Sequence, residues 1–275
     1  MECRSIPPHS VCSLSNRRRR CADAARPVLL PSNLIPHRAM PQEANKSSGL
    51  QPTPQPGWWY HGWASARIFA GVTGRSTSVE QLLGRLPFQT AVVELEQVHG
   101  GSFAVIEAPP RTRSRIPGCD ALLTGQPGVA LLVRTADCLP LVIADPSRGV
   151  VGVVHAGWRG LASGLPLRVI MAFRQLYHSA PEALRVGIGP AIRSCCYEVG
   201  PEFAARFGAF VQQRQGRWMC DLIGVAVDQL QRGGVQRGQV IDSGRCTSCE
   251  AQQWFSVRRE GDTTGRLTSL IAIRP

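Results

Sequence analysis

The strongest constraint on the fold is a pair of apolar runs joined by a turn, within residues 135–160 (TADCLPLVIADPSRGVVGVVHAGWRG). The runs at 139–144 and 150–154 lack polar alternation, which is typical of strands buried on both faces. Between them, the segment DPSRG is rich in turn-forming residues and predicts a hairpin loop. The sequence therefore predicts two paired strands inside a covered sheet.

The hairpin register determines which side chains share a face. Loops of two or of four residues give the same register, with His155 opposite Pro140. Cys138 then lies two places further along that face, and such diagonal neighbours are about 7–8 Å apart at Cα. We expect Cys138 and His155 to be able to reach one ion, whereas a loop of odd length would turn one of them away.

The remaining pattern divides the chain in two. Residues 57–275 predict one mixed α/β domain, with further strands at 91–98, 103–107, 129–134, 184–188, 240–242, 254–258 and 267–273. Helices are predicted at 161–177, 202–213 and 222–232, the last with Asp221 as N-cap and Gly233 as its stop. Residues 1–56 hold nine prolines without periodicity, and predict a disordered basic extension. This extension is interpreted as a flexible tail or as sequence upstream of an initiator at Met40, with a targeting or interaction arm as the alternative.

Composition narrows the setting. The ten cysteines lack a convincing secretory segment, because the arginines at 17–20 precede a stretch broken by prolines. No apolar run approaches the roughly 20 residues that span a bilayer. We therefore expect a cytoplasmic protein with mostly free thiols and no membrane partner. The net charge of +12 suits phosphate or nucleotide ligands, but basic patches interleaved with aromatics, as in nucleic-acid binders, are not visible.

Further candidates are weaker on spacing alone. Arg159 follows a strand-to-helix turn whose free N–H groups favour an anion, so it is either a phosphate partner or a surface residue of a Gly-rich turn. His99 ends an apolar strand, but composition does not raise it above His61 or His178. The pair CTSC (246–249) is half of a zinc ribbon without a second pair of suitable spacing, and is interpreted as structural. The adjacent cysteines at 195–196 are interpreted as packing residues.

Five motifs occur together in an order that resembles a known family. They are LEQVHG (95–100), TADCLP (135–140), HAGWRGL (155–161), IGPAI with CCYEVG (188–200), and CT, FSVRR and TGR between 246 and 266. Together, from about residue 57 to 274, they resemble the YfiH-like family, also labelled laccase-domain or polyphenol oxidoreductase proteins. The chain departs from the family where it opens with HGWASA (61–66), and a family segment containing Asn-Leu-Gly is missing from 71–89. If that segment shapes the pocket, specificity differs here.

The resemblance implies a four-layer α/β/β/α fold with mixed sheets in a single domain. It also implies a zinc ion held by His99, Cys138 and His155, for which copper is a possible substitute. The implied activity is phosphorolysis of adenosine, inosine, guanosine or methylthioadenosine, with deamination of adenosine. The partners are then purine nucleosides and phosphate, and the protein a monomer or small homo-oligomer.

The expected chemistry follows from three ligands that leave a fourth metal position open, as in catalytic zinc sites. Zinc there would activate water for attack on purine C6. Arg159 and Arg258 are expected to hold phosphate, and Asp137 and Glu96 to carry protons or orient ligands.

Alternative functions remain open at this point. A cysteine hydrolase would use Cys138 as nucleophile and His155 as base, and some family members are linked to editing of peptidoglycan precursors. A non-catalytic metal-binding protein is a third reading. Laccase activity is not expected, because the six histidines include no His-x-His pair of the kind that multicopper oxidases use.

Overall fold

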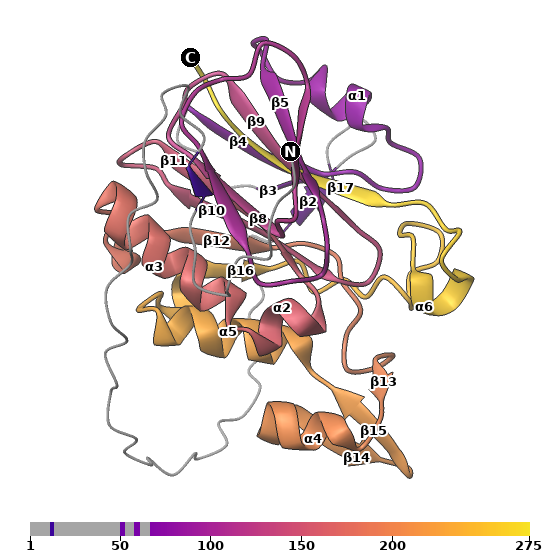
Figure 1. Cartoon of the computed structure of the whole chain (residues 1–275). Coiled ribbons are helices and arrows are strands. Elements are labelled where there is room, and N and C mark those ends of the chain that lie inside the picture. Colours follow the sequence, from indigo (N-terminus) through magenta and orange to yellow (C-terminus); the bar gives the residue numbers. More distant parts are fainter. Residues whose placement is uncertain (1–11, 14–49, 53–57, 61–66) are drawn as a thin grey trace.

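Two seven-stranded sheets pack face to face; several helices cover the outer face of the first sheet, and one short helix packs on the outer face of the second (Figure 1). The computed structural model describes residues 12–13, 50–52, 58–60 and 67–275. The first sheet runs, in spatial order, β1 (Cys12–Ser13), β6 (Phe103–Ile106), β8 (Ala121–Thr124), β11 (Val150–Ala156), β10 (Leu139–Asp145), β12 (Arg185–Ile188) and β16 (Val240–Asp242). The second runs β2 (Leu50–Pro52), β3 (Trp58–Tyr60), β4 (Ile68–Val72), β17 (Leu267–Ile273), β9 (Val129–Thr135), β5 (Ala91–Glu96) and β7 (Ser114–Pro117).

Three apolar clusters separate four layers. One lies between the two sheets and draws side chains from both. A second joins the first sheet to α2 (Trp158–Ala162), α3 (Leu165–Tyr177) and α5 (Leu222–Arg232), and a third joins the second sheet to α1 (Val79–Leu83). The mixed α/β architecture with an α/β/β/α order of layers is therefore confirmed.

The central hairpin has the predicted register. Strands β10 and β11 pair antiparallel with Pro140 opposite His155, and Asp145 pairs with Val150 across a four-residue loop. The Asp145 carboxylate accepts hydrogen bonds from the backbone N–H groups of Ser147 and Arg148, which closes the turn. Every residue of both strands is buried, as expected for runs without polar alternation.

The helix predicted at 161–177 is two helices. Helix α2 ends at Ala162, and α3 begins at Leu165 after Gly164, which takes a left-handed conformation at φ 73°. Pro166 stands in the first turn of α3, where its missing N–H costs nothing but where it could not continue an earlier helix. The prediction for 222–232 is confirmed as α5, and Asp221 caps it by accepting from the N–H of Gly224.

The helix predicted at 202–213 is too long. Helix α4 (Glu202–Phe207) stops at Gly208, which has φ 53°, and a 3₁₀ turn (Gly208–Phe210) leads into β14 (Val211–Arg214). This strand pairs with β15 (Arg217–Cys220), which pairs in turn with β13 (Glu198–Val199). Gln215 and Gly216 both have positive φ, so the two-residue turn favours a hairpin over a longer helix.

The prediction of a strand at 254–258 is wrong, because part of this segment is helical. Ser256 accepts a hydrogen bond from the N–H of Arg259 and so caps the short helix α6 (Val257–Glu260). The other predicted strands are present with small shifts at their ends, and 3₁₀ turns occur at Pro181–Ala183 and Arg237–Gln239. The predicted elements include no counterpart of helix α1 or of strands β3, β4, β7, β8, β13 and β15.

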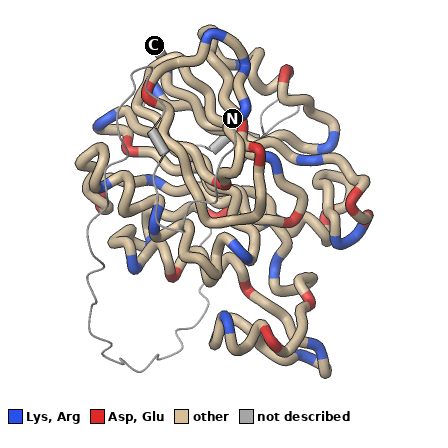
Figure 2. The backbone as a smooth tube through the Cα atoms, viewed as in Figure 1, with Lys and Arg blue, Asp and Glu red and all other residues tan. Residues whose placement is uncertain are grey.

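Strands β1 and β2 lie within the extension predicted for residues 1–56, and the rest of that prediction falls outside the described residues. The divergent segment 61–66 also falls outside them. Among the described residues, no helix is both long enough and apolar enough to cross a membrane. Figure 2 shows arginines and acidic residues interspersed along the described chain, with no continuous basic stripe.

Candidate metal centre

His99, Cys138 and His155 converge at one end of the two packed sheets. One potential ligand atom from each lies within 4.8 Å of the others. The two imidazole rings are 4.6 Å apart between centroids and nearly perpendicular, at 87°. Cys138 precedes β10 and His155 lies in β11, whereas His99 follows β5 of the other sheet. The site therefore forms only where the sheets meet.

Two residues of this end have an unusual backbone conformation. His99 has φ 57° and Asp137, next to Cys138, has φ 92°. Positive φ is uncommon outside glycine and often accompanies functional sites, because surrounding structure must hold it in place. With this backbone conformation, the ring of His99 lies against that of His155 in the hairpin.

A carboxylate that the sequence analysis did not single out orients the site. Asp120 is fully buried directly before β8, and its Oδ1 lies 2.7 Å from Nδ1 of His155. The backbone N–H groups of His99 and Gly100 donate to the same carboxylate. A metal-binding histidine typically donates its second N–H to such a group. The available signal was a lone carboxylate directly before the apolar run 121–124.

The site also sets the protonation of its members. Burial raises the pKa of the Cys138 thiol, but hydrogen bonds with His155 and His99 outweigh this and lower it to about 6. For His155, burial lowers the pKa, and the bonds to Asp120 and Cys138 raise it to about 9. Without metal, the two groups therefore favour a thiolate at Cys138 beside a protonated His155. The thiolate is the form that binds metals, and His155 would release its proton on binding an ion.

Both carboxylate oxygens of Asp137 accept hydrogen bonds from neighbouring segments. Its Oδ1 accepts from the hydroxyl of Thr247 at 2.6 Å, and its Oδ2 accepts from the backbone N–H of Arg258 at 2.7 Å. These bonds hold the loop before β10 against the start of α6. Of the two carboxylates predicted to carry protons or orient ligands, Asp137 is held by two donors, and Glu96 is exposed on the cavity wall.

The three residues open into a cavity of about 970 Å³. Its wall includes four arginines, at positions 115, 134, 258 and 266, and the ring of Tyr197. The guanidinium of Arg258 lies 5.2 Å from the centre of that ring and donates to the carbonyl of Glu198. Three carboxylates also line the cavity, those of Glu96, Asp137 and Asp262, so the wall near the candidate metal position carries charges of both signs.

Arg159 is not brought to this wall. Its guanidinium lies over the ring of Trp158, 4.4 Å from the ring centre, and it is not among the residues that line the cavity. Of the two arginines predicted to hold phosphate, only Arg258 lines the cavity.

Comparison with known proteins gives consistent matches. Residues 72–274 match the family described as "Multi-copper polyphenol oxidoreductase laccase". A protein named purine nucleoside phosphorylase YlmD, from Geobacillus stearothermophilus, is 35% identical over 194 residues, covering 65% of this chain and 71% of the relative. A purine nucleoside phosphorylase from Deinococcus radiodurans is 39% identical, covering 65% and 69%. The crystal structure of G. stearothermophilus YlmD superposes with a TM-score of 0.76 at 28% identity, covering 83% of this chain and all of that one.

Proposed function

The chain belongs to the multi-copper polyphenol oxidoreductase laccase family, and we propose that it is a zinc-dependent purine nucleoside phosphorylase that also deaminates adenosine. The observation that carries the proposal is the convergence of His99, Cys138 and His155 beside a cavity walled by arginines. The names of the similar proteins supply the substrate class, purine nucleosides with phosphate. The specific nucleosides proposed are adenosine, inosine, guanosine and methylthioadenosine.

The three side chains fit a zinc ion by their chemistry. Two imidazoles and one thiolate are preferred zinc donors, and three protein ligands are typical of catalytic sites. The buried carboxylate of Asp120 holds His155 so that Nε2 is the nitrogen left for the ion. Copper could occupy the same donors, since it binds such sites more tightly in the affinity order. Bound here, zinc would supply Lewis-acid activation of water or of a substrate oxygen.

Phosphorolysis forms a bond from a phosphate oxygen to C1′ of the ribose and breaks the bond from C1′ to the purine nitrogen. The electron pair leaves with the base, which takes up a proton, and ribose 1-phosphate remains. Arginines suit the phosphate because their planar donors match its oxygens. Arg134 is well placed: its backbone is held by Gln97, and no carboxylate of the described residues forms an ion pair with its guanidinium.

The remaining cavity groups suit the nucleoside. Tyr197 offers an aromatic face for the purine, and its ring is held beside Arg258. Asp137 keeps the Cys138 loop in place through Thr247 and the N–H of Arg258. Glu96 is an exposed carboxylate of the wall and is the proposed proton carrier to the departing base.

Laccase activity is not part of the proposal. Gathering four electrons for oxygen reduction requires several copper ions bound by many imidazoles. The described residues contain one group with two histidines and one cysteine, and a second group made of cysteines alone. The family's descriptive name is therefore not extended to the reaction of this chain.

The test is incubation of metal-analysed protein with adenosine, with and without phosphate, followed by separation of the products. The proposal expects adenine and ribose 1-phosphate only when phosphate is present, and inosine in both conditions. A parallel incubation with peptidoglycan precursors tests the hydrolase alternative. Turnover of those precursors without any turnover of adenosine, inosine, guanosine or methylthioadenosine would overturn the proposal.

A further inference from the structure

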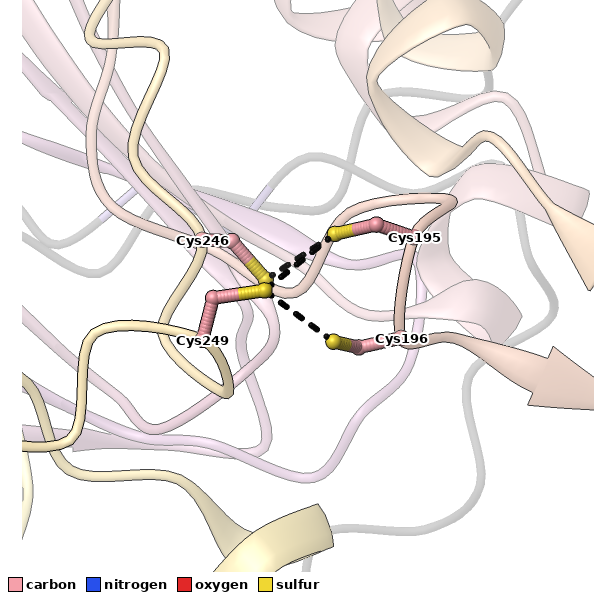
Figure 3. A group of neighbouring side chains, drawn as sticks. All are labelled: Cys195, Cys196, Cys246 and Cys249. Carbon is pink, nitrogen blue, oxygen red and sulfur yellow. Dashed lines mark hydrogen bonds between the residues drawn. The ribbon is translucent and has the colours of Figure 1, made fainter.

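Four cysteines form a second group outside the cavity (Figure 3). Cys195 and Cys196 lie in the turn after β12, and Cys246 and Cys249 in the turn after β16. All four sulfur atoms lie within 4.8 Å of one another, and all four thiols are free. Spacing rules did not find this group because one pair is vicinal and the other is about 50 residues further along.

We propose that these four cysteines bind one metal ion, zinc by preference, at a site separate from the histidine-containing centre. Around a tetrahedral zinc with Zn–S bonds of about 2.3 Å, sulfur atoms lie about 3.8 Å apart. The Sγ of Cys195 is 3.5 Å from those of Cys246 and Cys249, and the Sγ of Cys196 is 3.3 Å from that of Cys249. These separations are close to that geometry and far longer than a disulfide bond of about 2.05 Å.

The donor set determines the class of ion. Four thiolates form a soft environment that favours zinc over calcium or magnesium, which prefer oxygen. The compact grouping suits one ion, and four protein ligands close its coordination, as in structural zinc sites. Cys195 and Cys249 are exposed, so an ion can enter from solvent.

The backbone around the cysteines is already arranged for this. Residues Ala191 and Cys246 form an isolated parallel bridge, and the N–H of Thr247 donates to the carbonyl of Ala191. The N–H of Cys246 donates to the carboxylate of Glu250, while backbone N–H groups of Cys249 and Arg193 are directed to the Cys246 sulfur. Hydrogen bonds from the backbone stabilise a thiolate as a ligand. Two loops distant in sequence are thus held with their sulfurs facing inward.

An ion at this position would support the cavity wall without touching substrate. Cys196 is followed directly by Tyr197, and Cys246 by Thr247, which holds the carboxylate of Asp137. The four-cysteine site would therefore fasten together the two loops that present these groups. Its role is structural, and it does not depend on which reaction the cavity carries out.

The experiment measures zinc per chain in protein purified under reducing conditions and passed through a metal-free column. We expect two zinc ions in the wild-type protein, one in Cys249→Ser, and one in His99→Ala. Cys220→Ala, which alters a buried thiol outside both groups, is the matched control and retains two. Since metal content is read without substrate, a failure of the proposed phosphorylase activity leaves this result unaffected.

A second measurement covers the case in which Cys249→Ser does not fold. Cobalt(II) is added to folded His99→Ala protein, where the four cysteines are the remaining complete group among the described residues. Intense sulfur-to-cobalt charge-transfer bands with a tetrahedral spectrum support the site. Absence of those bands, unchanged zinc content in folded Cys249→Ser, or two disulfides in the non-reduced wild-type protein would each overturn it.

Discussion

Oδ1 of Asp120 lies 2.7 Å from Nδ1 of His155, and both side chains are almost completely buried. The same carboxylate accepts hydrogen bonds from the backbone N–H groups of His99 and Gly100. Asp120 therefore orients the ring of His155, which belongs to the first sheet. It also holds the turn after β5 of the second sheet, which carries His99. The pair is the point at which the two halves of the candidate metal centre are joined.

Replacing this carboxylate tests that role. Asp120→Asn should lower zinc affinity at the histidine-containing centre by about 10- to 100-fold, as loss of a partner behind a metal-binding histidine typically does. Competition with a chromogenic chelator measures the change, using protein in which Cys249→Ser removes the second proposed site. Asp228→Asn, on the exposed face of α5, is the control. Equal affinities for the two variants would contradict the role of Asp120.

Gly157 provides a steric test of the same centre. A Cβ atom there would lie 3.3 Å from the Cys138 sulfur and 3.5 Å from the His99 ring, although φ of −74° suits any residue. We expect Gly157→Ala to weaken zinc binding while leaving the thermal unfolding of metal-free protein nearly unchanged. Gly238→Ala, whose Cβ would meet no atom within 4 Å, is the matched control. A variant with wild-type zinc affinity would show that the ion does not bind beside Gly157.

Metal removal separates the proposed enzyme from a cysteine hydrolase. Dialysis against a strong chelator should abolish turnover of adenosine, and added zinc should restore it. A Cys138 nucleophile assisted by His155 would instead remain active without metal. Full activity at a zinc content close to zero is the outcome that decides for the hydrolase.

Two arginine variants locate the phosphate site. Arg134→Gln should raise the KM for phosphate by about 10-fold or more, because loss of a hydrogen bond to a charged group costs about 1.5–3 kcal/mol. Arg159→Gln should change it little, since this side chain stacks on Trp158 away from the cavity wall. Steady-state rates at varied phosphate and saturating nucleoside provide both values. A larger rise in the KM for phosphate in Arg159→Gln than in Arg134→Gln would support the phosphate-binding role that the sequence predicted for Arg159.

Acid should remove the stabilisation that Glu260 gives to the loop after α6, because the carboxylate becomes protonated. Hydrogen bonds from Thr264, Arg259 and Arg75 lower the pKa of this carboxyl from 4.5 to about 2. Its contribution to folding is then complete above pH 4.5 and is lost as pH falls toward 2. The difference in unfolding free energy between wild type and Glu260→Gln should therefore narrow over that range in denaturant titrations. Glu182→Gln, which has no ion-pair partner among the described residues, serves as the comparison, and parallel curves for the two variants would refute the prediction.

Local structure followed from the sequence wherever short-range rules apply. Period and turn chemistry predicted β10 and β11 with their register, and Asp221 as the cap of α5. The wrong predictions of secondary structure also have local causes. Proline in the first turn of α3, positive φ at Gly208, and the Ser256 cap each ended or replaced an element that apolar periodicity alone extends.

The sequence by itself predicted that Cys138 and His155 share one face if the hairpin loop has an even number of residues, and the four-residue loop of the structure satisfies that condition. It could propose His99 only through family resemblance. Tertiary structure decided that His99 reaches them from the other sheet, and that Asp120 holds both the ring of His155 and the backbone of His99. It also decided that Cys195 and Cys196 meet Cys246 and Cys249. The physical reason is that residue spacing specifies neighbours along one strand or helix. Which loops meet depends on how two sheets and their helices bury their apolar faces together.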